Sequence, residues 1–228
     1  MQNISKETFS FLNDLKLNNN REWFENNKSR FIDIQKEIKL FSSTAIGELN
    51  KHDNIESSKI FRIYRDVRFS KNKTPFKSNL GLSFKRSTSG LRGGYYFHIK
   101  PNESFVACGF FNPNKEDLLR IRKEFEFDSD EFRQIINDKS FKNNWGVIDG
   151  DPLKTYPRGF LKDSSNIDLI RMKRFIFIKN YSDNSVISSN FIDNMSCDFK
   201  IMRPFLDYMS TLLTTDLNGV SILKLNII

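Results

Sequence analysis

The hydrophobic pattern of this 228-residue chain changes its period near residue 60. Upstream, apolar side chains recur at spacings of three, four and seven from Phe24 to Leu49, which predicts a long amphipathic helix ending near Asn50. Downstream, apolar and polar residues alternate, which predicts strands over residues 60–70, 79–86, 94–100 and 104–112. Short, turn-rich connections separate these segments and favour antiparallel neighbours. The chain therefore has to combine helices with an antiparallel sheet.

Capping residues indicate further helices around this predicted sheet. Ser5 can cap a short first helix that the polar residues 18–20 end, and Asn114 and Ser129 can cap two more. Two later segments look extended, residues 141–148 and 174–181.

A second long helical pattern runs over residues 188–213. Pro204 has to kink or split it, because proline lacks an N–H and clashes with the preceding turn. The economical fold class is α+β, a single domain with a central antiparallel sheet packed against long N- and C-terminal helices. Its expected parts are N-terminal helices (5–50), a sheet (59–112), mixed helices and strands (114–181) and a C-terminal helix (188–215).

Composition agrees with a folded globular protein. Hydrophobic residues make up 38% of the chain and 23 residues are Phe, so aromatic rings should fill the core. Cys108 and Cys197 are far apart and are expected to be reduced and buried. No stretch approaches the roughly 20 apolar residues of a membrane helix, and the first ten residues lack a secretory pattern. We therefore expect no membrane span and a cytoplasmic location.

The basic residues are concentrated in one part of the chain. Residues 59–100 hold eleven Lys or Arg and a single acid, Asp66, a net charge of +10. The rest of the chain holds 25 basic and 27 acidic residues, a net charge of −2. The whole excess of the protein's formal +8 therefore lies in this segment, which predicts a negatively charged partner.

Six of these bases belong to the predicted first strand and the loop after it. On a strand, Arg65 lies in an apolar row, whereas Arg62, Asp66 and Arg68 share the other face. A guanidinium in an apolar row is costly unless it is paired or reaches water, and a bulge would bring it to the polar face. Arginine forks on a sheet suit bidentate recognition of phosphate or carboxylate. The loop adds donors that can close over an anion, namely Lys71, Lys73, Thr74 and Lys77.

Other candidates lie further along the chain. Tyr96 and His98 share one face of the third predicted strand, and a nearby cationic cluster would lower the pKa of His98 and keep it neutral at pH 7. Arg158 follows Pro157 in a turn from which it can project into a pocket. A hydrogen-bonded sheet histidine and an ordinary turn are the structural alternatives.

Metal and cofactor signals are weak. Asp149 and Asp151 with Lys154 resemble fragments of metal-dependent nuclease sites, but Asp-Gly-Asp-Pro is first of all a turn sequence, with Asp149-Gly150 a candidate hairpin. The sequence contains no phosphate-binding loop, dinucleotide fingerprint, nucleophile elbow or zinc helix motif. We expect no metal and no cofactor.

Several of these residues belong to longer motifs. They are Asn19-Asn20-Arg21-x-Trp23-Phe24-x-x-Asn27-Lys28, Arg62-x-x-Arg65-Asp66-x-Arg68-Phe69-Ser70-Lys71-x-Lys73-Thr74-Pro75-x-Lys77, Gly94-Tyr95-Tyr96-x-His98-Ile99 and Pro157-Arg158-Gly159-Phe160. In these motifs the chain resembles the conserved hypothetical proteins of the family called domain of unknown function 2461. Asn102 stands where such sequences more often have Gly, and Ala107 with Cys108 replaces a Gly-rich run. The resemblance implies a single domain with its site at the basic motif, and it implies no particular chemistry.

The leading hypothesis is a pocket for a phosphorylated or otherwise anionic ligand, in which Asp66 orients one arginine or accepts a proton. Should the ligand also be transformed, neutral His98 or Asp66 is the best candidate base. The alternative is a nucleic-acid-binding module whose bases follow the phosphate backbone while Tyr95 or Tyr96 stacks on a base. A flat surface for an acidic protein partner is a third possibility. The oligomeric state is left open.

Overall fold

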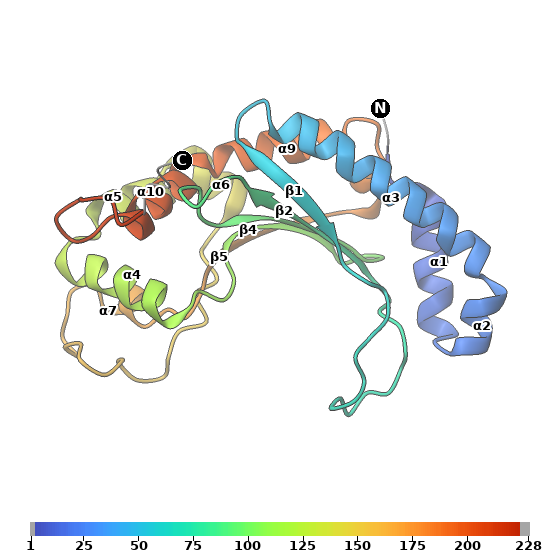
Figure 1. Cartoon of the computed structure of the whole chain (residues 1–228), viewed down its shortest axis with the longest axis horizontal. Coiled ribbons are helices and arrows are strands. Elements are labelled where there is room, and N and C mark those ends of the chain that lie inside the picture. The colour runs from blue at the N-terminus through green and yellow to red at the C-terminus, as the bar shows by residue number, and fades with distance from the viewer. Residues whose placement is uncertain (1–2, 224–228) are drawn as a thin grey trace. The chain divides into compact units, whose positions relative to one another are not determined.

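A computed structural model describes residues 3–223 of the chain (Figure 1). Its sheet is antiparallel with five strands in the order β1-β2-β3-β4-β5, which confirms the predicted α+β class. The strands are β1 (Ile55–Ile60), β2 (Leu80–Arg86), β3 (Gly94–Ile99), β4 (Ser104–Phe110) and β5 (Phe175–Tyr181). The predicted extended segment 174–181 is thus the fifth strand of the same sheet.

Three helices precede the sheet, namely α1 (Lys6–Leu17), α2 (Arg21–Asn26) and α3 (Lys28–Leu49). Ser5 caps α1 as predicted, since its side chain accepts the Thr8 N–H at 3.3 Å. The predicted long helix is divided at Asn27, whose backbone leaves the helical region with φ −112° and ψ 15°. The Asn27 side chain donates to the Trp23 carbonyl at 2.9 Å, a local bond that competes with the helical pattern.

The later helices are α4 (Lys115–Phe127), α5 (Asp130–Asn137), α6 (Lys139–Trp145), α7 (Ile167–Ile170), α8 (Asp183–Val186), α9 (Phe191–Ile201) and α10 (Arg203–Thr214). The prediction of an extended segment at 141–148 was wrong, because residues 141–145 belong to α6. Phe141 and Trp145 are spaced by one helical turn, and both are buried. Asp138 caps this helix by accepting the Phe141 N–H at 2.9 Å.

Two further expectations concern the last helices. Pro204 splits the C-terminal pattern as predicted, and it occupies the first turn of α10, where its missing N–H costs nothing. Cys197 was expected to be buried and is exposed, because it lies on the opposite side of α9 from the buried Met195 and Phe199. Cys108 is buried, and the two cysteines are not joined by a disulfide.

The chain forms two compact units, each assembled from separate stretches. Unit 1 contains Met1–Lys85, Tyr96–Val106 and Asn180–Cys197, and unit 2 contains Arg86–Tyr95, Ala107–Lys179 and Asp198–Ile228.

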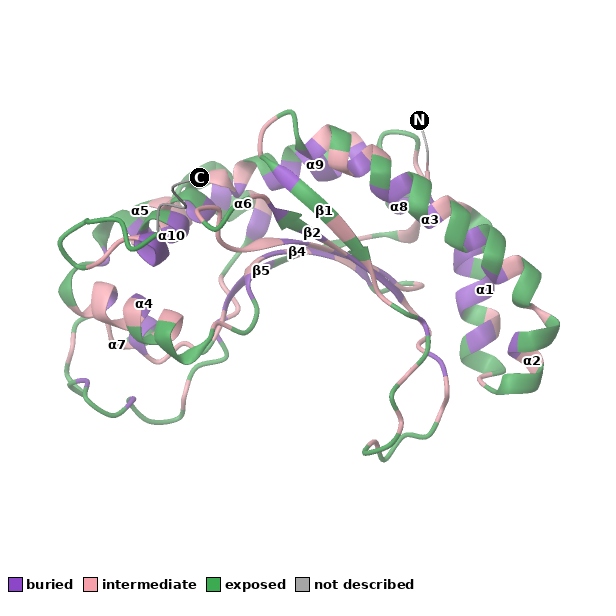
Figure 2. Ribbon diagram, viewed as in Figure 1, coloured by how far each residue is buried: buried purple, intermediate pink, exposed green. Residues whose placement is uncertain are grey.

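Aromatic rings fill the core of unit 1, as the composition predicts. Phe24 stacks on Phe76 with ring centroids 4.1 Å apart, and Phe31 packs against Phe24 at 5.2 Å. Phe41 of α3 contacts Phe97 of β3 at 5.5 Å. Figure 2 shows the buried residues of α1 and α3 alternating with exposed ones, as amphipathic helices require.

Unit 2 has an aromatic core of its own and one buried charge. Phe205 of α10 contacts Phe177 of β5 at 5.3 Å, and Trp145 stacks on Phe199 at 5.8 Å. The side chain of Arg86 is fully buried and donates to Asp207 at 3.0 Å. A buried guanidinium is tolerated because its hydrogen bonds are satisfied.

Candidate functional site

Residues 61–79, here called the arm, connect β1 to β2 and do not form the strand predicted at 60–70 (Figure 1). Only the base of the arm is paired. The backbone N–H of Arg65 donates to the Pro75 carbonyl at 2.9 Å, and the backbone N–H of Lys77 donates to the Ile63 carbonyl at 2.7 Å.

The tip of the arm is irregular because side chains take over its backbone bonding. The Asp66 carboxylate accepts the Arg68 N–H at 3.2 Å, and the Asn72 side chain accepts the Thr74 N–H at 3.0 Å. Such local bonds compete with ladder pairing. Phe69, also at the tip, is 97% exposed.

Asn19, in the connection from α1 to α2, holds the base of the arm. Its side-chain amide donates to the Phe76 carbonyl at 3.0 Å and accepts the Phe76 N–H at 3.1 Å. One amide thus satisfies both backbone groups of a residue, as a neighbouring strand would. The first and second sequence motifs therefore meet at this point.

A hollow of about 440 Å³ in unit 1 lies where the arm meets the end of α1. Its lining consists of Lys16, Asn19, Arg65, Asn72, Thr74, Phe76, Lys77, Ser78 and Asn79. We call this site the basic hollow, since three of these residues are cationic and none is acidic. Within residues 3–223, Lys16, Arg65 and Lys77 form no ion pair. Arg65 is held in place by a 2.8 Å hydrogen bond from its guanidinium to the Thr74 hydroxyl.

Three residues predicted for the site line the basic hollow, namely Arg65, Thr74 and Lys77. Five others belong to the arm but are not part of the lining, namely Arg62, Asp66, Arg68, Lys71 and Lys73.

Contacts within the arm occupy part of this second group. Arg68 donates to both carboxylate oxygens of Asp66, at 3.0 and 2.7 Å, and both residues are exposed. This hydrogen bonding lowers the pKa of Asp66. Lys73 donates to the Val67 carbonyl at 3.0 Å. The arginine that Asp66 orients is therefore Arg68 and not the one in the hollow.

Tyr96 and His98 lie side by side on β3. The Tyr96 hydroxyl is 3.0 Å from Nδ1 of His98, and the ring of Phe105 stacks on His98 with centroids 4.6 Å apart. The pKa of His98 is lowered, first by burial and then by Lys100. The direction is as predicted, but burial contributes more than the neighbouring cation.

The remaining sequence candidates belong to unit 2. Arg158 lies on an exposed turn and does not line the basic hollow. Asp149 accepts hydrogen bonds from Arg174 at 2.8 and 2.7 Å, and Asp151 pairs with Lys173 at 2.8 Å.

These pairings bear on the metal and turn hypotheses for this stretch. Asp149 bridges to Ile176 and so does not form a two-residue hairpin. Across residues 3–223, no group of three His, Cys, Asp or Glu side chains is arranged to hold a metal ion.

Sequence reasoning missed six residues of the lining, namely Lys16, Asn19, Asn72, Phe76, Ser78 and Asn79. Asn19 carried a signal, because it opens the first motif. Lys16 carried none, since an exposed lysine in the last turn of a helix is an ordinary surface residue.

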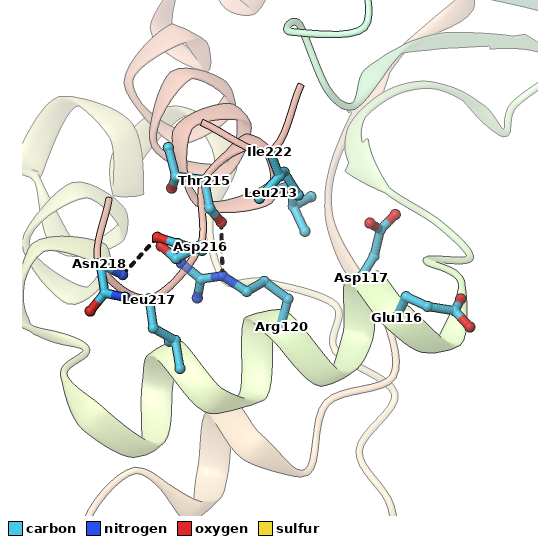
Figure 3. A pocket seen from close by; sticks show the side chains of 9 residues that line it. All are labelled: Glu116, Asp117, Arg120, Leu213, Thr215, Asp216, Leu217, Asn218 and Ile222. Atoms are coloured by element: carbon cyan, nitrogen blue, oxygen red, sulfur yellow. Dashed lines mark hydrogen bonds between the residues drawn. The ribbon is translucent and has the colours of Figure 1, made fainter. Parts of the chain in front are cut away.

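Unit 2 contains another hollow, of about 500 Å³, shown in Figure 3. Its one cationic side chain, Arg120, donates to the Thr215 carbonyl at 3.2 Å and to Glu124 at 2.7 Å. Glu116, Asp117 and Asp216 also line it. An anion would meet three carboxylates here, so the basic hollow is the better candidate.

Fold and site together define an α+β protein with a cationic hollow at the base of a strand-connecting arm. The family described as conserved hypothetical protein (DUF2461) matches residues 7–208, so the chain belongs to this family, as the resemblance predicted. Comparison with curated proteins and with solved structures finds no match. Among the described helices, none combines the length and the apolar character needed to cross a membrane.

Proposed function

We propose that this protein binds a small anionic ligand, through a phosphate group, in the basic hollow. The observation that carries the proposal is the convergence of Lys16, Arg65 and Lys77 on one concavity whose lining has no acid. Like charges repel one another, and a bound anion relieves that repulsion.

The chemistry of the lining fits a phosphate. Arg65 offers a planar fork of donors, and Lys16 and Lys77 offer point charges. Asn, Thr and Ser side chains supply neutral donors around them. The volume of about 440 Å³ lies in the range of roughly 300–1,000 Å³ typical of small-molecule sites. A phosphorylated metabolite would also suit the cytoplasmic location proposed from the sequence.

The test compares thermal unfolding in sodium phosphate and in sodium chloride of equal ionic strength. Phosphate at a hundred times its Kd adds about 2.7 kcal/mol of stability and should raise Tm by roughly 5–10 °C. Arg65→Ala should weaken phosphate binding by roughly tenfold or more, because a hydrogen bond to a charged group is lost.

Arg68→Ala is the matched control, since Arg68 belongs to the same arm and its guanidinium is bound to Asp66. Its phosphate affinity should match that of the wild type. Absence of any phosphate-specific shift, or an equal loss in both variants, would contradict the proposal.

Nucleic-acid binding is the second candidate, and one observation favours it. The side chain of Phe69 is 97% exposed on the tip of the arm, beside Arg68, Lys71 and Lys73, which are exposed as well. Proteins that bind single-stranded nucleic acids combine aromatic side chains with Lys and Arg. The nucleobases stack on the aromatic rings, and the phosphates contact the cationic side chains. This candidate uses the tip of the arm, whereas a small anion uses its base.

A further inference from the structure

Four partly exposed aromatic side chains gather on one face of the sheet in unit 1. We call Phe61, Tyr96, His98 and Phe105 the ring face. Tyr96 contacts Phe61 at 6.0 Å and Phe105 at 5.9 Å between ring centroids, and His98 stacks on Phe105 at 4.6 Å. The alternate residues Phe97 and Ile99 of β3 are fully buried on the opposite face. The ring face is therefore the solvated side of the strand.

Gly81 of β2 makes room for this cluster. A Cβ atom at position 81 would lie 2.6 Å from the Tyr96 hydroxyl oxygen, closer than any side chain could approach. The Tyr96 ring thus lies over Gly81, on the face toward which a side chain there would point.

The ring face adjoins the basic hollow. Asn79 lines the hollow and directly precedes β2, two residues before Gly81, so the hollow lies at the start of this strand. Because β2 and β3 are antiparallel, the start of β2 and the His98 end of β3 lie at the same edge of the sheet.

Glu103, in the turn from β3 to β4, gives a second link. Its pKa is lowered first by Lys100, to which it is hydrogen-bonded, and more weakly by Lys16 and His98. Lys16 belongs to the hollow and His98 to the ring face. One carboxylate is thus close enough to both sites to interact electrostatically with each.

We infer that the anion bound in the basic hollow is the phosphate of a nucleoside monophosphate whose base lies against the ring face. The inference rests on the proposed function and narrows its ligand class. The cationic side chains of the hollow bind the phosphate. The base stacks on the partly exposed rings and buries their surface, and the sugar spans the two sites. Tyr96 and His98 bring polar atoms that can bond the edge of a base.

The first experiment uses the wild-type protein and three probes, namely adenosine 5′-monophosphate, ribose 5-phosphate and inorganic phosphate. Calorimetric titration should give an affinity for the nucleotide at least roughly tenfold above that for ribose 5-phosphate, because only the nucleotide has a base to stack. Equal affinities would overturn the inference and leave phosphate binding in place. Failure of all three to bind would instead overturn the proposed function itself.

The second experiment locates the base. His52 and His98 are the two histidines of the chain, so their ring protons give two sets of NMR signals, which His52→Gln assigns. The nucleotide should shift the His98 signals by its ring current, and ribose 5-phosphate should shift them far less. Saturation with the nucleotide that leaves the His98 signals in place would overturn the inference.

A pair of variants supports the location independently. Phe105→Leu should remove the preference for the nucleotide and keep the affinity for inorganic phosphate. Phe127→Leu is the control, because Phe127 is 88% exposed and belongs to unit 2. A nucleotide preference that survives in Phe105→Leu would place the base elsewhere and overturn the inference.

Discussion

At the scale of single residues, burial decides what a charged side chain does. Arg86 and Lys85 are neighbours on β2, but the side chain of Arg86 is fully buried while that of Lys85 is 71% exposed. Arg86 donates to Asp207, to the Ser210 hydroxyl at 3.1 Å and to the Arg92 carbonyl at 2.9 Å. Lys85 has one exposed ion pair, with Glu56. The sequence alone gives no reason to treat the two differently.

Replacement of Arg86 by Met should therefore be strongly destabilising. Removing one partner of a buried ion pair costs about 3–5 kcal/mol, and the half-exposed Asp207 favours the lower end of that range. Lys85→Met is the matched control and should change the free energy of unfolding by less than about 1 kcal/mol. Urea denaturation measures both, and equal losses would contradict this account.

His98 predicts a pH dependence of stability. Burial holds the pKa of His98 below its ordinary value of 6.5, so the unfolded chain binds this proton at a higher pH than the folded protein does. The free energy of unfolding should accordingly decrease as the pH falls below about 6.5. His98→Gln should make this part of the profile flatter, and NMR titration of His98 should give a midpoint below 6.5. A midpoint above 6.5 would reverse the expected sign.

At the scale of elements, the arm shows how a strand-like sequence becomes a loop. Alternating residues from 60 to 70 predicted a strand, yet the strand ends at Ile60 and pairing continues only at the base of the arm. The segment Ile55–Ile60, read IESSKI, is polar and was not predicted to be a strand. Hydrogen bonding to β2 determines where this edge strand lies, and that information is not local.

Asn19 should matter more than an ordinary connecting residue. Asn19→Ala removes both hydrogen bonds to the Phe76 backbone, which should cost about 1–3 kcal/mol of stability and weaken phosphate binding. Asn18→Ala serves as control, since Asn18 is exposed and its side chain bonds only the Asp14 carbonyl. Urea denaturation and phosphate titration test both variants. If Asn19→Ala bound phosphate as the wild type does, the arm would not depend on this clamp.

At the scale of the whole molecule, the distribution of charge sets what the protein attracts. Residues 59–100 carry a net charge of +10, and the rest of the chain carries −2. This segment is therefore the main source of positive electrostatic potential. The two candidate functions use this potential differently. A single phosphate meets the few cations of the hollow, whereas a nucleic acid strand meets many along the arm.

Salt should therefore distinguish them. Raising sodium chloride from about 0.05 to about 0.5 M should weaken phosphate binding by roughly tenfold, because the cations of the hollow are partly screened. The affinity for a single strand that contacts the protein through four phosphates would fall roughly a thousandfold over the same range. Titration of an oligothymidylate beside phosphate measures both slopes. Tight, steeply salt-dependent oligonucleotide binding that Phe69→Ala weakens would favour the second candidate over our proposal.

Local patterns in the sequence determined most of the elements. The helices at 6–17 and 28–49, four of the five strands and the break at Pro204 follow from apolar periodicity, caps and the missing proline N–H, because these signals act within a few residues. The prediction for residues 141–148 was wrong because the spacing of Phe141 and Trp145 fits both the helical period of 3.6 and the strand period of 2 over so short a stretch. The concentration of positive charge in residues 59–100 is also read directly from the sequence, since charge is a property of composition.

Tertiary structure alone decided which cations share a site. It separates Arg65 from Arg68 by giving the first a hydroxyl partner and the second a carboxylate. It also brings Asn19 to Phe76, 57 residues further along the chain, and Lys16 to the same hollow. Hydrogen bonding and packing between segments distant in the sequence fix these positions, and no local pattern in the chain records which distant segments will meet.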